Sequence, residues 1–427
     1  MEVIMNVKQI TALLPEFTTF LQLFNGCFVN KRSFEHLSTY CKGLMSSLKR
    51  KSAEPIAIAS GTAVRTLQQF LATANWNHEQ MRNLIQKRIA KRISSLSSQT
   101  QDALGAIGII DETSVVKKGN KTPGVKRQYL GCVGKVENGI VTVHLACVLN
   151  TFKTIIDSAL FLPKSWSEDR DRCKEANIPD DLVHQSKTQL ALEQIRTAIS
   201  NGLALNWLTF DEGYGKSPAF LFELEKMGQH YVAEVPKSFC CWAQPFENRA
   251  KPNSSESRNK KLLPIKKAQN ICRFSPLFSQ QNWQTIDLER QTQGSQKWRV
   301  KAAQVYLKDS VGQPIQRTYW LIFAWQKASN RYKYFISNAA IEVGVLTLLK
   351  VAFTRWNVEQ SFRFAKGELG FGHFEGRHYN GLIRHMTLCS LVMLFLAEKT
   401  AEQAAFSPSG DIGADVSLFE CVVSSVA

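Results

Sequence analysis

The 427-residue sequence lacks several features that would assign it to a familiar class of protein. Its ten cysteines include no C-x-x-C pair, which argues against a zinc ribbon or a dense disulfide framework and favours a reducing compartment. The longest apolar run, Met386 to Ala397, is too short to cross a bilayer, and Pro15 and Glu16 interrupt the only apolar stretch that resembles a signal peptide. We therefore expect a cytoplasmic protein with no membrane partner.

A nucleotide-binding loop is also missing. Gly119 to Gly124 has the glycine spacing of a P-loop, but Val125 occupies the lysine position and Pro123 has no amide hydrogen to donate to a phosphate. We find no internal repeat.

Negative charge is scarce in the first 100 residues, which contain no Asp and 5 Glu against 13 Lys and Arg. The whole chain carries a net charge of +17, which favours an anionic polymer as its partner. The segment from His78 to Ile93 predicts an amphipathic helix whose polar face is basic. We predict a helical DNA-binding domain over residues 1–98, although a basic face of this kind could simply be solvated. The residues of this face expected to contact DNA include Lys87, Arg88, Lys91 and Arg92.

From residue 99 the pattern changes to alternating strands and helices, which predicts an α/β core. Antiparallel strands are expected at 106–111, 128–134 and 140–148. The Asn138-Gly139 pair predicts a hairpin turn before the last of them. The proposed domains are a first part of the core at 99–235, a β-rich insertion at 236–335, a helical second part of the core at 336–397 and a tail at 398–427.

Three carboxylates stand out because of their positions. Asp111 and Asp211 each follow an apolar run that predicts a strand, and Glu359 lies on a predicted helix. One such aspartate alone is more often a helix cap or a turn residue, but together the three can converge on one point. A site of carboxylates without a fixed His or Cys suits Mg²⁺, with Mn²⁺ as a substitute.

Two such ions about 4 Å apart can activate a water or a 3′-hydroxyl and stabilise the leaving oxygen of a phosphodiester. In this arrangement Asp111 bridges both ions, while Asp211 and Glu359 each complete the ligand set of one. Arg355 and Lys366 fall on the same helical face as Glu359 at 3.6 residues per turn. We expect both cations to contact phosphates beside the scissile bond. Taken alone, such a stripe is also typical of a surface ion pair.

These residues and their spacing resemble the DDE transposases of bacterial insertion sequences, in the branch with a Tyr-Arg-Glu-Lys signature and a β-rich insertion. The similarity covers roughly residues 20–397 and includes the block from Arg355 to Arg377; Ala352 occupies the position of the signature tyrosine. The resemblance implies a ribonuclease-H-like core with a mixed sheet, Mg²⁺-dependent cleavage at element ends, and strand transfer into target DNA. It also implies a homodimer on double-stranded DNA with terminal inverted repeats, associated with the bacterial nucleoid.

The spacing of the carboxylates supports an inserted domain independently, because 100 residues separate Asp111 from Asp211 and 148 separate Asp211 from Glu359. The resemblance further suggests that Trp207 stacks on a displaced base, whereas the strand pattern alone favours a core tryptophan. A basic segment near Asp111 is expected to contact DNA, unless it is only a solvated turn. The residues of this segment expected to contact DNA are Lys117, Lys118, Lys121 and Arg127.

Two alternatives remain at this point. One is a nuclease of the same fold that cuts DNA without strand transfer. The other is a non-catalytic DNA-binding derivative of a transposase.

Overall fold

The computed structural model describes residues 7–99, 104–243, 248–249, 263–264, 268–271, 278, 282–290, 294–308 and 314–406. The chain divides into two compact units, the first comprising Met1–Ala204 and Trp356–Ala427 and the second Leu205–Arg355. Both units contain helices and strands, which confirms the predicted α/β class. The domain boundaries given above stay predictions.

The first unit starts with a group of helices. They are α1 (Val7–Gln22), α2 (Lys31–Met45), α3 (Ala53–Ala59), α4 (Val64–Ala72) and α5 (His78–Gln99), with a short 3₁₀ turn at Asn25–Cys27. Helix α5 begins after Asn77, whose side chain accepts the Gln80 N–H at 2.8 Å. Its residues Met81, Ile85 and Ile89 are buried at a spacing of one helical turn, so the helix predicted from residue 78 is confirmed.

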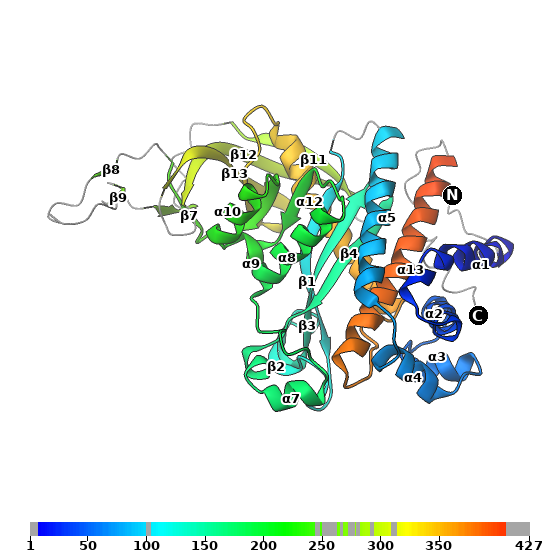
Figure 1. Ribbon diagram of the computed structural model, residues 1–427. Coiled ribbons are helices and arrows are strands. Elements are labelled where there is room, and N and C mark those ends of the chain that lie inside the picture. Colours follow the sequence, from blue (N-terminus) through cyan, green and yellow to red (C-terminus); the bar gives the residue numbers. More distant parts are fainter. Residues whose placement is uncertain are drawn as a thin grey trace. The chain divides into compact units, whose positions relative to one another are not determined.

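An antiparallel sheet follows in the same unit. Its strands are β1 (Ile107–Val116), β2 (Lys126–Leu130), β3 (Lys135–Leu149) and β4 (Phe152–Leu160). Strand β3 pairs with each of the other three. The helices α6 (Lys164–Ser167), α7 (Arg170–Glu175), α8 (Lys187–Ser200) and α13 (Tyr379–Phe406) complete the unit. Figure 1 shows α5 and α13 side by side, and both contact β4.

The turn predicted at Asn138-Gly139 is wrong, because β3 continues through both residues. The β2–β3 turn lies instead at residues 131–134, where Gly134 adopts a positive φ of 65°. Gly139 pairs with neighbours on both sides of β3, and a Cβ atom there would lie 2.4 Å from the Val115 carbonyl oxygen. The glycine therefore permits close strand approach rather than a reversal of the chain.

Helix α13 is longer than the sequence suggested, because residues 398–406 of the predicted tail belong to it. Its segment Tyr379–Ala404 is long and apolar enough to span a membrane by length and composition alone, with a mean hydropathy of 1.4. Within the fold 83% of the apolar window is buried, as in the core helix of a soluble protein. Its packing against α5 and β4 accounts for its apolar character.

The second unit contains a mixed sheet in the order β11-β12-β13-β14-β6-β5. Strands β5 (Trp207–Phe210) and β6 (Tyr231–Val235) are parallel and are connected through α9 (Glu212–Gly215) and α10 (Pro218–Lys226). The others, β11 (Gln284–Arg290), β12 (Gly294–Lys308), β13 (Pro314–Gln326) and β14 (Arg331–Ser337), are antiparallel. The strand-like runs predicted at 298–306 and 318–325 are thus confirmed.

Small elements complete the second unit. They are β7 (Cys240–Cys241), β8 (Asn248–Arg249), β9 (Leu263–Pro264), β10 (Gln269–Asn270) and a 3₁₀ turn at Lys327–Ser329. Helix α12 (Val345–Gly367) begins in this unit and ends in the first. Much of the predicted insertion, including 250–262, lies outside the described residues. Antiparallel strands, a helix and then a parallel strand pair are consistent with a ribonuclease-H-like core.

Candidate active site

Asp111 lies in the middle of β1 rather than at the exit of a strand, which corrects the sequence prediction. The strand continues to Val116 because these further residues pair in register with β3. The Asp111 carboxylate is half-buried, and its Oδ1 accepts the Glu112 N–H at 2.7 Å. The neighbouring Glu112 carboxylate forms an ion pair with Lys187 at 2.5 Å. The two adjacent acids of β1 therefore differ in their partners: the Asp111 carboxylate accepts a backbone N–H, whereas the Glu112 carboxylate pairs with a lysine.

Lys366 lies in the last turn of α12 and is half-buried. Burial lowers the pKa of its ammonium group, and the charges of Cys132 and Asp111 oppose that shift. The Lys366 ammonium thus lies within electrostatic range of the Asp111 carboxylate, and both residues belong to the first unit. A lysine near a carboxylate can pair with it, and it can also bind the oxygens of a phosphate that approaches.

His144 is a further residue of this region that the sequence reasoning missed. It faces Asp111 across the β1–β3 pairing and is fully buried. Its Nε2 lies 2.7 Å from the Thr142 hydroxyl and its Nδ1 lies 2.8 Å from the Ser158 hydroxyl. Burial, followed by the charge of Lys366, lowers the pKa of His144 to about 3, so the ring is neutral. A single histidine within the apolar run of residues 140–148 was the signal that could have identified it.

Asp211 follows β5 directly and is the N-cap of α9, where its Oδ1 accepts the Gly213 N–H at 2.9 Å. Trp207, at the start of β5, is half-buried with its ring 5.6 Å from that of His230. Arg355 is half-buried on α12 in the same unit. Glu359 lies on α12 as predicted, but its side chain is outside the described part of the structure.

The donor set of these acids fits a hard divalent cation. Asp111 and Asp211 each offer carboxylate oxygen, and in each the Oδ1 atom is oriented by a backbone N–H. Among the side chains that the structure describes, no group of three His, Cys, Asp or Glu is placed to hold a metal ion. Glu359 is not among those side chains, so convergence of the three carboxylates stays a prediction.

Two of the cations on the basic face of α5 bind carboxylates of the same chain. Arg88 donates from Nε and Nη2 to the two carboxylate oxygens of Glu398, each at 2.7 Å. Arg92 forms an ion pair with Glu402 at 3.6 Å. These contacts join α5 to α13. Of the four residues predicted here to contact DNA, only Lys87 and Lys91 are exposed in the described part of the chain.

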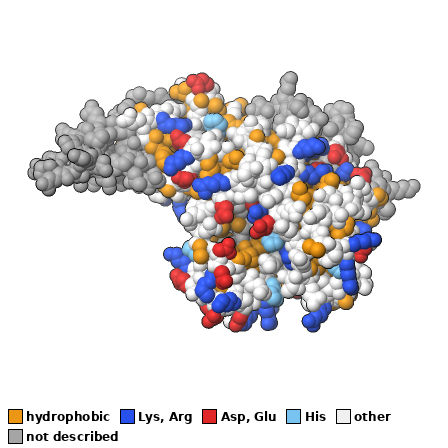
Figure 2. All heavy atoms as spheres, in the orientation of Figure 1, with side chains coloured by type: hydrophobic (Ala, Val, Ile, Leu, Met, Phe, Trp, Pro, Cys, Tyr) orange, Lys and Arg blue, Asp and Glu red, His pale blue; other side chains and the backbone are white. Residues whose placement is uncertain are grey.

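The basic segment after β1 is similarly divided. Lys117 is half-buried and donates from Nζ to the carbonyl oxygens of Gly372 and Phe374, at 3.2 and 2.5 Å. Lys121 forms an exposed ion pair with Glu175, whereas Lys118 and Arg127 are exposed. Figure 2 shows Lys and Arg side chains in several separate groups on the face drawn, with Asp and Glu among them. On this face the positive charge is therefore divided among several groups rather than gathered in one patch.

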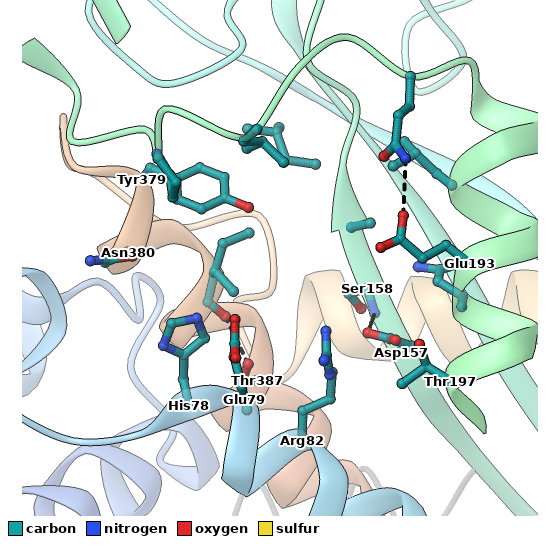
Figure 3. Close-up of a pocket in the computed structure, with 18 of the residues that line it drawn as sticks. His78, Glu79, Arg82, Asp157, Ser158, Glu193, Thr197, Tyr379, Asn380 and Thr387 are labelled. Carbon is teal, nitrogen blue, oxygen red and sulfur yellow. Dashed lines mark hydrogen bonds between the residues drawn. The ribbon is translucent and has the colours of Figure 1, made fainter. Parts of the chain in front are cut away.

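A cavity of about 500 Å³ is lined by residues of α5, β4, α8 and the start of α13, all in the first unit. Figure 3 shows Asp157 and Glu193 on one side and Glu79 with Arg82 on another. Asp157 accepts the Ser158 N–H at 2.7 Å, and burial raises its pKa to about 6 against the opposing charge of Arg82. This mixed-charge cavity contains none of the predicted site residues.

Comparison with known proteins now decides the family. A family model described as DDE superfamily endonuclease matches residues 22–305, which is more than half of the chain. The chain belongs to this family. The matched region of this DDE superfamily endonuclease includes Asp111 and Asp211 and ends before Glu359. Members of the superfamily generally use divalent metal ions.

A probable transposase for insertion sequence element IS701 from Microchaete diplosiphon is 30% identical over 220 residues. The aligned region is 51% of this chain and 52% of that protein. The chain thus spans about half the length of the curated relative that it matches.

Proposed function

We propose that this protein is a DNA transposase that cleaves DNA at the ends of an insertion sequence and joins those ends to target DNA. The supporting observation is the position of Asp111 in the middle of β1, with Lys366 in electrostatic range, in a chain of the DDE endonuclease family. The similarity to an insertion sequence transposase supports strand transfer over simple cleavage.

Asp111, Asp211 and Glu359 would hold two Mg²⁺ ions, which supply activation of the attacking oxygen and stabilisation of the leaving oxygen. The chain's own cations have a different role. Lys366 and Arg355 bind phosphate oxygens next to the scissile bond and hold the strand in position. The ring of His144, which lies opposite Asp111 in the β1–β3 pairing and contacts Thr142 and Ser158, is neutral and adds no charge next to Asp111. Trp207 is proposed to stack on a base near the cut.

The test compares two adjacent acids on one strand. Asp111→Asn keeps the side-chain volume and should reduce Mg²⁺-dependent nicking of element-end DNA by about 1,000-fold, which corresponds to a loss of about 4 kcal/mol. Glu112→Gln removes an ion pair with Lys187 but should leave nicking within a few-fold of wild type. Cleavage that persists in the Asp111 variant would refute the assignment.

A second assay separates transposition from simple hydrolysis. Pre-cut element ends are incubated with a supercoiled plasmid and Mg²⁺, and joined products are detected on a gel. Joining supports the transposase, whereas cutting without joining indicates a nuclease, and neither activity indicates a DNA-binding derivative. The proposal also includes a homodimer on the DNA and a cytoplasmic, nucleoid-associated location. Light scattering of the protein with and without element-end DNA tests the dimer.

A further inference from the structure

A second cavity of the first unit, of about 770 Å³, is formed by three segments that are far apart in the sequence. Arg50 comes from the connection between α2 and α3, residues 116–122 follow β1, and residues 372–377 precede α13. We name this cavity the basic cleft, after the cations that line it. They are Arg50, Lys117, Lys118, Lys121 and Arg377.

Carboxylates of the described residues balance only part of this charge, since Lys121 pairs with Glu175 at 2.5 Å. Glu375 is the one acid in the lining, and it already pairs with Arg50 and accepts from the Ser52 hydroxyl at 3.3 Å. Lys118 and Arg377 are both exposed, and the described part of the chain provides neither of them with an ion-pair partner. The cleft therefore presents uncompensated positive charge from two separate segments.

The walls of the cleft are held by polar contacts within the chain. Lys117 donates to two carbonyl groups of the 372–374 segment, and the Asn138 amide donates to the carbonyls of Lys117 and Gly119 at 2.7 and 2.8 Å. Lys51 is buried and donates to the carbonyls of Leu44 and Glu368. Such contacts fix the backbone before any ligand arrives, which lowers the entropy cost of binding.

The lining also indicates how a ligand would be held. Of its two aromatic side chains, Phe374 is buried, and His373 is half-buried with its Nδ1 accepting the Lys51 N–H at 3.1 Å, so the lining presents no exposed ring to stack on a base. Exposed Lys and Arg on an open surface suit the phosphates of an extended polyanion rather than one enclosed anion.

We propose that the basic cleft binds the phosphate backbone of DNA outside the cleavage site, without reading base sequence. This inference rests on the proposed function. Lys118 lies seven residues beyond Asp111, a distance of about 23 Å along an extended chain. Because duplex DNA rises about 3.4 Å per base pair, the contacted phosphates lie about seven base pairs from the cut.

The test measures how DNA affinity depends on salt, without divalent metal so that no cleavage occurs. A fluorescent duplex of about 30 base pairs is titrated with the full chain between about 50 and 200 mM salt. Lys118→Ala combined with Arg377→Ala removes two phosphate contacts. The plot of log K against log salt has a negative slope, which should become less steep by about 1.8 in this variant. The matched control, Lys164→Ala with Lys174→Ala, removes two exposed lysines of α6 and α7 and should leave the slope unchanged.

Each result has one meaning. If the wild-type chain binds DNA and the cleft variant shows the same slope of log K against log salt, the basic cleft does not bind DNA. The proposed function is not affected by that result. A wild-type chain that binds no DNA overturns both. If the variant loses affinity for inorganic phosphate but keeps its salt slope on DNA, the cleft is a small-anion site and the inference is wrong. Equal melting temperatures of variant and wild type are expected, because Lys118 and Arg377 are exposed.

Discussion

Arg88 offers the sharpest test of how the basic residues of α5 are used. Its guanidinium group makes two hydrogen bonds of 2.7 Å to Glu398, whose side chain is only 6% exposed, whereas that of Arg88 is 37% exposed. Removing one partner of a fully buried ion pair costs about 3–5 kcal/mol. Because Arg88 is partly solvated, we expect Arg88→Met to cost about 2 kcal/mol, which lowers the melting temperature by about 4 °C.

A double-mutant cycle isolates the pair from the rest of the helix. Glu398→Gln preserves the shape of the side chain and removes its charge, so Arg88→Met combined with Glu398→Gln should be more stable than Arg88→Met alone. The coupling energy is expected to be about 1.5–3 kcal/mol. Thermal or urea denaturation of the four proteins provides the measurement.

DNA binding by the same variants separates a structural role from a phosphate contact. Arg88→Met should leave the salt dependence of DNA affinity unchanged. Lys87→Met is the matched control, because Lys87 is the exposed neighbour on α5 and should not change the melting temperature. If Arg88→Met retains full stability and makes the slope of log K against log salt less steep by about 1, the structural role is refuted and Arg88 contacts a phosphate.

Two further predictions concern buried charges. Burial lowers the pKa of Lys117 to about 8, so its folded form releases its proton before the unfolded form does, and wild-type stability should gain relative to Lys117→Met as the pH rises from about 8 to about 10. Parallel denaturation curves across that range would contradict this. Burial raises the pKa of Asp157 to about 6, so its stabilising contribution is present below about pH 4 and is lost as the pH rises through 6. Asp157→Asn should therefore be more stable than wild type at pH 7.5, with a difference that fades below pH 4, as denaturant titrations at several pH values would show.

Local pattern was sufficient for much of the secondary structure. The buried spacing of Met81, Ile85 and Ile89 is a property of neighbouring turns, so the sequence predicted α5 correctly. The Asn138-Gly139 pair misled because a glycine can serve either a turn or a close strand approach, and only pairing with the Val115 strand decides between them. The length of β1 beyond Asp111 depends on the same pairing.

The roles of the basic residues could not be predicted in this way. Arg88 and Lys117 look the same in sequence as Lys87 and Lys118, yet the first two bind partners 310 and more than 250 residues away. A lysine on a basic stretch is available to DNA only if the fold supplies no carboxylate or carbonyl group closer to it. The partner-bound cations join distant segments, while the neighbouring exposed ones can bind phosphate. The net charge therefore predicts the class of partner, whereas the tertiary contacts determine which cations remain available to bind it.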